Sequence, residues 1–261
     1  MGGEWVKNIV MIHGMAGGGW CWEDYKHFFE QKGYRCHTPT LRFHQYSIYS
    51  TPNPQLGTTS ILDYVADLEK EIHQLDSKPI IIGHSMGGLI AQILGSRGLA
   101  QALVLITPAP PHGILISKRL LFIKGFLGVV TKWGFWKKPF RPSFNGFVNS
   151  VAHLLPASQQ KAIYDRMSWE SGQVGMEIGF SMFYKKPPTK VDESKITCPM
   201  LVIGATQDRI IPISLVNKVA KKYSAVSTYK VFPNHAHWII GEEGWHEVAE
   251  YIADWLKNHN G

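Results

Sequence analysis

Cysteine is scarce in this chain, and its few residues lie far apart. The 261 residues include only Cys21, Cys36 and Cys198. This odd number, without a C-x-x-C pair or a histidine at zinc-ligand spacing, argues against a disulfide scaffold and against a zinc site. We therefore expect buried thiols, a reducing compartment and no metal.

The chain also lacks a long uninterrupted apolar run. The longest one, "LLFIKGFLGVVTKWGFWKKPF" at 120–140, is broken by lysines and glycines, so it is too short and too charged to span a bilayer. Residues 1–6 include Glu4 and leave no room for the charged start and apolar middle of a signal peptide. These features predict a cytoplasmic protein without stable membrane insertion.

Charged residues make up only 18% of the chain, and the net charge of +7 is concentrated in one segment. Residues 110–195 contain thirteen Lys or Arg and five Asp or Glu, which leaves the rest of the chain nearly neutral. No nucleic-acid-binding motif accompanies these cations. A solvated basic face is therefore favoured over a nucleic-acid site, a site for anionic substrates or contact with a membrane surface.

Six apolar runs of strand length recur along the sequence. They are continuous rather than alternating, as in a parallel sheet buried on both faces. Amphipathic helical periods separate several of them, for example within 58–75 and from Trp245 onward. The alternation predicts an open, doubly wound α/β sheet of about six mostly parallel strands flanked by helices. The expected strands span 6–12, 34–38, 78–83, 102–107, 199–205 and 227–232.

One segment interrupts this alternation. Between residues 110 and 195 no strand-like run is followed by a matching helix, and the composition turns basic and aromatic. We predict a helical cap over 110–195, inserted after the fourth strand into a core made of residues 1–109 and 196–261. A chain of this length is consistent with one domain that carries an insertion.

The stretch "PIIIGHSMGGLIAQ" at 79–92 places a serine between an expected strand and an expected helix. The bend requires Gly83 and Gly87, because a side chain there would collide with a neighbouring element. Ser85 would then stand clear of the backbone as a nucleophile, with the Met86 amide directed at the group that it attacks. The alternative is that Ser85 merely caps the helix.

A nucleophilic serine needs a base, and the base needs an orienting carboxylate. Only residues just beyond a later strand can reach the same sheet edge. Asp208 is the first acid after the run at 199–205, while His235 and His237 both follow the run at 227–232. The order serine, acid, histidine is the one expected for this architecture.

Four segments, "MIHGMAGGGW", "GHSMGG", "GATQDRIIP" and "NHAHW", together make the chain resemble the α/β-hydrolase family in its cap-bearing esterase, lactonase and haloperoxidase-like branch. The resemblance implies that His237 is the base, since family members place a small residue before this histidine and an apolar residue after it. It also implies that the Met15 amide is the second oxyanion donor and that no cofactor is needed. The glycines at 17–19 have no P-loop or dinucleotide-binding spacing.

The aromatic composition of 110–195 suggests a hydrophobic ester or lactone as substrate, bound by a monomer or homodimer. The residues expected to line the substrate site are His112, Phe126, Trp133, Trp136 and Trp238. Two other classes remain open. The same triad supports C–C hydrolysis, hydroxynitrile lysis and perhydrolysis, and "HGMAGGGWCW" also resembles the plant methylesterase and hydroxynitrile lyase branch. The fold has also been reused in non-catalytic ligand receptors.

Overall fold

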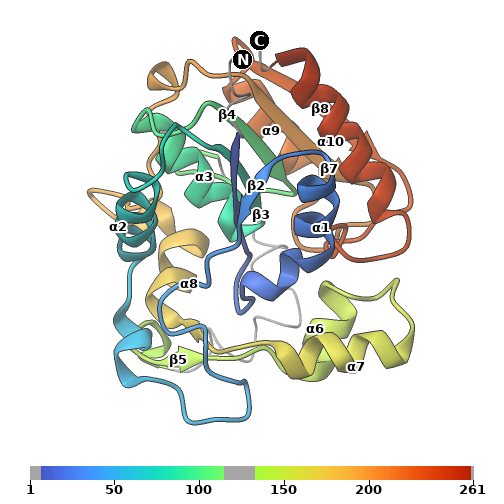
Figure 1. Ribbon diagram of the computed structural model, residues 1–261. Coiled ribbons are helices and arrows are strands. Elements are labelled where there is room, and N and C mark those ends of the chain that lie inside the picture. The colour runs from blue at the N-terminus through green and yellow to red at the C-terminus, as the bar shows by residue number, and fades with distance from the viewer. Residues whose placement is uncertain (1–6, 115–132, 260–261) are drawn as a thin grey trace.

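The computed structural model describes residues 7–114 and 133–259, and a six-stranded sheet forms the centre of this part of the chain (Figure 1). All neighbouring strands are parallel, in the order β2-β1-β3-β4-β7-β8, which confirms the predicted sheet. The strands are β1 (Asn8–Ile12), β2 (Arg35–His37), β3 (Ile80–His84), β4 (Ala102–Ile106), β7 (Met200–Ala205) and β8 (Ser227–Phe232).

The four central strands β1, β3, β4 and β7 are buried on both faces, which explains why they are continuously apolar, whereas the edge strands β2 and β8 are partly exposed. In β1, Ile9 and Met11 belong to one hydrophobic cluster, while Val10 and Ile12 belong to the other. Two helices cover the first face, namely α1 (Glu23–Gln31) and α10 (Trp245–His259) (Figure 1). The second face is covered by α2 (Ile61–Ile72), α3 (Met86–Ser96) and α9 (Ile213–Lys222).

Side-chain hydrogen bonds cap the start of α2, the helix expected within 58–75. The Ser60 hydroxyl accepts a hydrogen bond from the Leu62 amide, and the Asp63 carboxylate accepts one from the Ser60 amide. These contacts satisfy amides that have no partner within the helix. The helix therefore begins where the sequence offers its Ser-x-x-Asp pattern.

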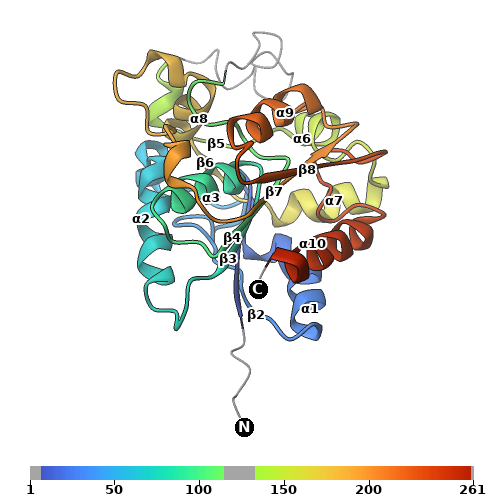
Figure 2. The ribbon, with the colours of Figure 1, turned by 90° about the horizontal axis from the view of Figure 1, so that it is seen from above.

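The described residues between β4 and β7 lie across the carboxyl ends of the strands (Figures 1 and 2). Their helices are α6 (Phe144–Ser150), α7 (Ala157–Arg166) and α8 (Gly172–Gly179). They also include an antiparallel ribbon of β5 (Pro139–Phe140) and β6 (Glu170–Ser171), whose two-residue strands are too short to leave a periodic pattern in the sequence. The 3₁₀ turns are Gly19–Trp22, Pro54–Thr58, Phe135–Lys137, Ser181–Phe183 and Glu193–Lys195.

The bend between β3 and α3 is tight enough to exclude side chains at two positions. A Cβ atom added to Gly87 would lie 2.1 Å from the Ile12 carbonyl oxygen, and one added to Gly83 would lie 2.3 Å from the Gly87 carbonyl oxygen. Ser85 stands between them with φ 54° and ψ −117°, a conformation that few residues adopt. The chain can hold this strained serine because glycines stand two positions before it and two positions after it, where the bend leaves no room for a side chain.

Within the part of the chain that the structure describes, there is neither a disulfide nor a helix long and apolar enough to cross a membrane. Cys36 is buried, whereas Cys21 and Cys198 are partly buried, and all three are free thiols.

We predict that Gly87→Ala lowers the free energy of unfolding by at least about 3 kcal/mol, because the new methyl group must displace the backbone of β1. Gly33→Ala is the control. Unlike Gly87, Gly33 has a left-handed φ, of 86°, but an added Cβ there meets nothing within 4 Å, so the substitution should cost only about 1 kcal/mol of backbone strain. Urea unfolding measures both values, and equal costs would contradict the close approach at Gly87.

Candidate active site

The carboxyl ends of the parallel strands bring four loops together. Residues 13–16 follow β1, Ser85 follows β3, Asp208 lies beyond β7 and His237 beyond β8. Five non-glycine residues in the described chain have positive φ, and four of them follow the ends of β1, β3, β4 and β8: Ala16, Ser85, Thr107 and Asn234. Backbone strain of this kind concentrates where a site is held in a fixed geometry.

Ser85, His237 and Asp208 are linked by two hydrogen bonds. His237 Nε2 lies 3.0 Å from Ser85 Oγ, and His237 Nδ1 lies 2.7 Å from Asp208 Oδ2. The other carboxylate oxygen of Asp208 accepts from the amides of Ile210 and Ile211, at 2.7 and 2.8 Å. Because a carboxylate can only accept, Nδ1 carries the proton and Nε2 is free to accept one from the serine hydroxyl.

His235, the other candidate base, lies in a different environment. Its Nδ1 is 3.1 Å from Glu242 Oε1, which also accepts from the Ala236 amide at 2.7 Å. Its ring packs edge-on against Phe232, with the ring centres 6.1 Å apart. The histidine that contacts Ser85 is His237, the one that the family pattern favours.

Two backbone amides lie beside Ser85. Met86 is the first residue of α3, and Met15 follows Gly14, where an added Cβ would lie only 3.1 Å from Ser85 Cβ. Neither the Met86 nor the Met15 amide has a hydrogen-bond partner among the described residues. Both residues line the pocket described below, so these donors are available to a bound oxygen atom.

A buried histidine sets the direction of the Met15 amide. The Leu41 amide donates to His13 Nε2 at 3.1 Å, so His13 Nδ1 carries the proton and donates to the Gly14 carbonyl at 2.8 Å. That carbonyl and the Met15 N–H belong to one planar peptide and point in opposite directions. Burial and the neighbouring His44 lower the pKa of His13 to about 3, which keeps the ring neutral.

A second buried histidine holds the backbone of His237. His84 Nε2 lies 2.8 Å from the His237 carbonyl oxygen, to which it must donate, and the two rings are 4.8 Å apart. Burial lowers the pKa of His84 well below its ordinary value, so this ring is also neutral. Sequence reasoning assigned His84 no role, although its place just before Ser85 on a buried strand is a signal that could have revealed one.

A third buried histidine forms an ion pair that sequence reasoning missed. His44 Nδ1 donates to the Arg42 carbonyl at 3.0 Å, and His44 Nε2 lies 3.1 Å from Glu170 Oε2. Burial alone would lower the pKa of His44 and raise that of Glu170. The charge and hydrogen bond of each partner, together with hydrogen bonds from the backbone, outweigh burial, so the pKa of His44 is raised and that of Glu170 is lowered. Both side chains are fully buried.

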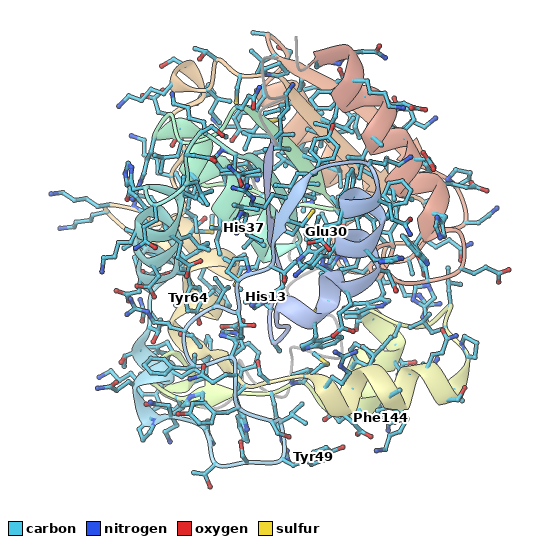
Figure 3. All side chains as sticks on the ribbon, viewed as in Figure 1. His13, Glu30, His37, Tyr49, Tyr64 and Phe144 are labelled. Carbon is cyan, nitrogen blue, oxygen red and sulfur yellow. The ribbon has the colours of Figure 1, made fainter. Side chains whose placement is uncertain are left out.

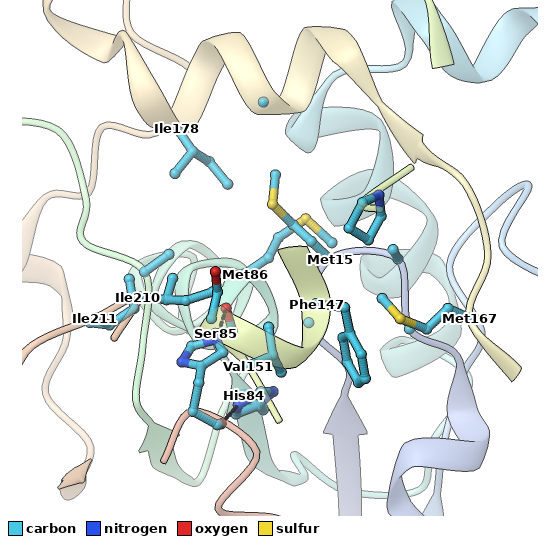
Figure 4. Close-up of a pocket in the computed structure, with 18 of the residues that line it drawn as sticks. Met15, His84, Ser85, Met86, Phe147, Val151, Met167, Ile178, Ile210 and Ile211 are labelled. Carbon is cyan, nitrogen blue, oxygen red and sulfur yellow. Dashed lines mark hydrogen bonds between the residues drawn. The ribbon is translucent and has the colours of Figure 1, made fainter. Parts of the chain in front are cut away.

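Above Ser85 lies an apolar pocket of about 190 Å³ (Figure 4). The strand loops provide its floor, while α6 and α8 provide much of its wall, with Ile178 pointing in from the side opposite Ser85. Among the described residues that line the pocket, none is Asp, Glu, Lys or Arg. Its larger apolar residues are Met15, Met86, Phe140, Phe147, Val151, Met167, Ile178, Phe180, Ile210, Ile211 and Trp238.

The residues expected to bind substrate have different positions. Trp238 lines the pocket, whereas His112, Trp133 and Trp136 are not among its lining residues. Trp133 is 90% exposed and contacts the ring of Trp136, and His112 bonds through its amide to the Thr189 carbonyl. Phe126 lies outside the described residues. The amides of Met15 and Met86 were expected at the site, but the sequence has no pattern from which the side chains of Met15, Met86 and Met167 could be expected to line the pocket.

No group of three or more His, Cys, Asp or Glu side chains in the described ranges is placed to hold a metal ion. The polar groups at the pocket floor are instead the serine, the histidines and the two free amides. Such an arrangement suits attack on a carbonyl carbon, with the amides bonding to the oxygen that becomes negative.

The chain matches the model of the alpha/beta hydrolase family over residues 9–251. It is 31% identical to a pyrethroid hydrolase of Sphingobium wenxiniae, with 95% of this chain and 87% of that protein aligned. It is 28% identical to a non-heme chloroperoxidase of Burkholderia pyrrocinia, over 90% and 86%. The structure superposes on a pyrethroid hydrolase from Sphingobium faniae with a TM-score of 0.73 and 18% identity, covering 97% and 98% of the two chains.

These matches span nearly the whole chain and agree with the parallel sheet and the strained serine between β3 and α3. The protein belongs to the α/β-hydrolase family, as its sequence motifs indicate.

The His44–Glu170 pair predicts how stability depends on pH. The raised pKa of His44 stabilises the fold fully below the unfolded-state value of about 6.5, and this contribution is lost as pH rises through the folded-state value. The lowered pKa of Glu170 stabilises the fold above about 4.5, and this is lost as pH falls. His44→Gln should therefore cost most between about pH 4.5 and 6.5, on the order of 2–3 kcal/mol.

Urea unfolding of wild type and His44→Gln between pH 4 and pH 9 measures this difference. A difference that stays constant across the whole range would show that His44 is not charged in the fold.

Proposed function

We propose that the protein is a serine hydrolase that cleaves a hydrophobic carboxylic ester through an acyl-enzyme on Ser85. The observation that carries the proposal is the pair of hydrogen bonds from Asp208 through His237 to Ser85, at 2.7 and 3.0 Å, beneath an apolar pocket. The names of the relatives, which include esterases and lipases, support ester hydrolysis in general.

In this proposal His237 takes the hydroxyl proton of Ser85 as the serine oxygen bonds to the acyl carbon. The amides of Met15 and Met86 donate to the carbonyl oxygen as it gains negative charge. His237 then gives the proton to the departing alcohol. Water, deprotonated by His237, releases the acid and restores Ser85. Asp208 holds the ring in the required tautomer and stabilises its positive charge.

The character of the pocket supports an uncharged, apolar acyl group. None of the described basic residues of 110–195 lines the pocket, which argues against an anionic substrate. Helices α6 and α8 supply much of the wall, so we propose that residues 110–195 act as a cap on a core of 1–109 and 196–261. A lactone would present the same carbonyl group and suits the same pocket.

Perhydrolysis is a second candidate, favoured by the similarity to a protein named non-heme chloroperoxidase. Hydrogen peroxide would replace water, attack the acyl carbon and leave as a peracid, while Ser85 regains its proton through His237. Peracid formation from a short acyl ester and hydrogen peroxide, absent in Ser85→Ala, would support this reaction.

The first experiment measures turnover of p-nitrophenyl esters from acetyl to long acyl chains, beside several lactones, with Ser85→Ala as the control. We expect turnover that vanishes in the control and rises with acyl length until the pocket is filled. Ile178→Trp should slow the longest esters more than acetyl, since Ile178 points into the pocket. Labelling of Ser85 by an organophosphate, without turnover of any ester or lactone, would instead favour a lyase or a ligand receptor.

Two matched histidine variants test which ring is the base. His237→Asn and His235→Asn each retain a donor near Nδ1, but only the first removes the nitrogen that faces Ser85. We expect His237→Asn to lower kcat on the order of 10⁶-fold and His235→Asn to leave it within a few-fold.

Asp208→Asn should lower kcat on the order of 10⁴-fold, since the base remains but loses its orienting carboxylate. Steady-state kinetics on one ester gives kcat for this variant and for the two histidine variants. Near-full activity in His237→Asn would rule out the proposed triad.

A further inference from the structure

We propose that Glu170, neutralised by His44, is a positioning residue for the Met15 amide. The inference rests on the serine-hydrolase function proposed above. Glu170 belongs to the segment between β4 and β7, whereas Met15 lies in the loop after β1. The link between them is the Ala16 amide, which donates to Glu170 Oε2 at 3.0 Å.

The peptide units on both sides of Met15 are fixed by buried groups. On one side His13 holds the Gly14 carbonyl at 2.8 Å. On the other side the Glu170 carboxylate accepts a hydrogen bond from the Ala16 N–H. Rotation of the Met15–Ala16 peptide would turn the Met15 carbonyl oxygen toward this carboxylate, and the two would repel each other. The Ala16 carbonyl in turn accepts from the Ser168 amide at 2.9 Å. Ala16 is thereby kept at φ 56°, a left-handed conformation that costs free energy for a residue with a side chain.

The two oxygens of the Glu170 carboxylate accept hydrogen bonds from four donors. Oε1 accepts from the Tyr64 hydroxyl at 3.0 Å and from the Ser171 amide at 2.7 Å. Oε2 accepts from the Ala16 amide and from His44 Nε2. The His44 ring also packs against the rings of His13 and Tyr64, which are labelled in Figure 3, with ring centres 5.3 and 5.5 Å away. A neutral glutamine has one acceptor oxygen in place of two and could not serve four donors.

The charge of His44 has a separate role. A bare carboxylate one residue away from the Met15 amide would repel the negative oxygen that forms during the reaction. The His44 imidazolium, 3.1 Å from the carboxylate, cancels that charge while the carboxylate keeps its hydrogen bonds. The site thus gains an acceptor strong enough to hold the loop without a net negative charge beside the reacting oxygen.

Glu177 provides a matched control for Glu170. It is also a buried glutamate of the same segment, and it accepts from the Ile61 amide at 2.8 Å and from Gln173 at 3.0 Å. It contacts α2 rather than the loop after β1, and it does not line the pocket. Glu177→Gln therefore repeats the substitution at equal burial and leaves the loop that carries Met15 untouched.

The kinetic test compares Glu170→Gln with Glu177→Gln on one p-nitrophenyl ester. We expect Glu170→Gln to lower kcat about 10–100-fold with KM within about 2-fold, because the amide acts on the transition state more than on the bound ester. The inhibition constant of a trifluoromethyl ketone, which forms a tetrahedral alkoxide on serine, should weaken by a similar factor. His44→Gln keeps a donor to Glu170 but loses the charge, so it should lower kcat in the same direction.

Amide hydrogen exchange measures the position of the loop without a substrate. Exchange at residues 14–18 should quicken in Glu170→Gln and stay at the wild-type rate in Glu177→Gln. Should Glu170→Gln fail to fold, Glu170→Asp carries both measurements, because its shorter side chain keeps the charge but cannot reach the Ala16 amide and His44 together.

Equal kcat losses in the two glutamine variants, or equal exchange at 14–18, would overturn the positioning role. Wild-type protein that turns over no ester would overturn the proposed function alone, since exchange would still decide whether Glu170 holds the loop.

Discussion

The approach of the first turn of α3 to the end of β1 is the constraint on which the rest of the site depends. With 2.1 Å between the place of a Gly87 Cβ and the Ile12 carbonyl oxygen, this helix begins in direct contact with the backbone of the neighbouring strand. That contact brings the loop after β1 beside Ser85, so the amides of Met15 and Met86 can face one oxygen atom. A side chain at Gly87 would separate the two loops and with them the two amides.

Buried histidines hold the loops around this contact, and they differ in charge. His13 and His84 are neutral, and each donates one hydrogen bond to a backbone carbonyl beside the site. His44 also donates to a carbonyl, but its other nitrogen faces the buried Glu170 carboxylate, which raises the pKa of the ring and favours its charged form. A neutral ring can fix a peptide plane without adding a net charge, whereas a charged ring is needed where a carboxylate must be balanced.

The sheet was predictable because its cause is local: six continuous apolar runs can be buried only between two layers of helices. The grouping of Ser85, Asp208 and His237 could also be predicted from the sequence, since each residue follows a strand and parallel strands end at one edge of the sheet. The choice between His235 and His237 needed the family pattern, because both follow β8. The residues of the pocket wall could not be predicted from the sequence. Trp133 and Phe180 both belong to the same aromatic segment, and only their packing decides that Phe180 faces the pocket and Trp133 faces solvent.

The position of Glu170 has a consequence for protein engineering. The segment between β4 and β7 both shapes the pocket and, through Ser168 and Glu170, bonds to the backbone of the loop after β1. A chimera that exchanged this whole segment for that of a relative would change substrate range and loop geometry together. An exchange that stops before Ser168 would replace α6 and α7 and keep those bonds. The point at which such an exchange should stop is therefore inside the segment between β4 and β7, before β6, rather than at its junction with the sheet.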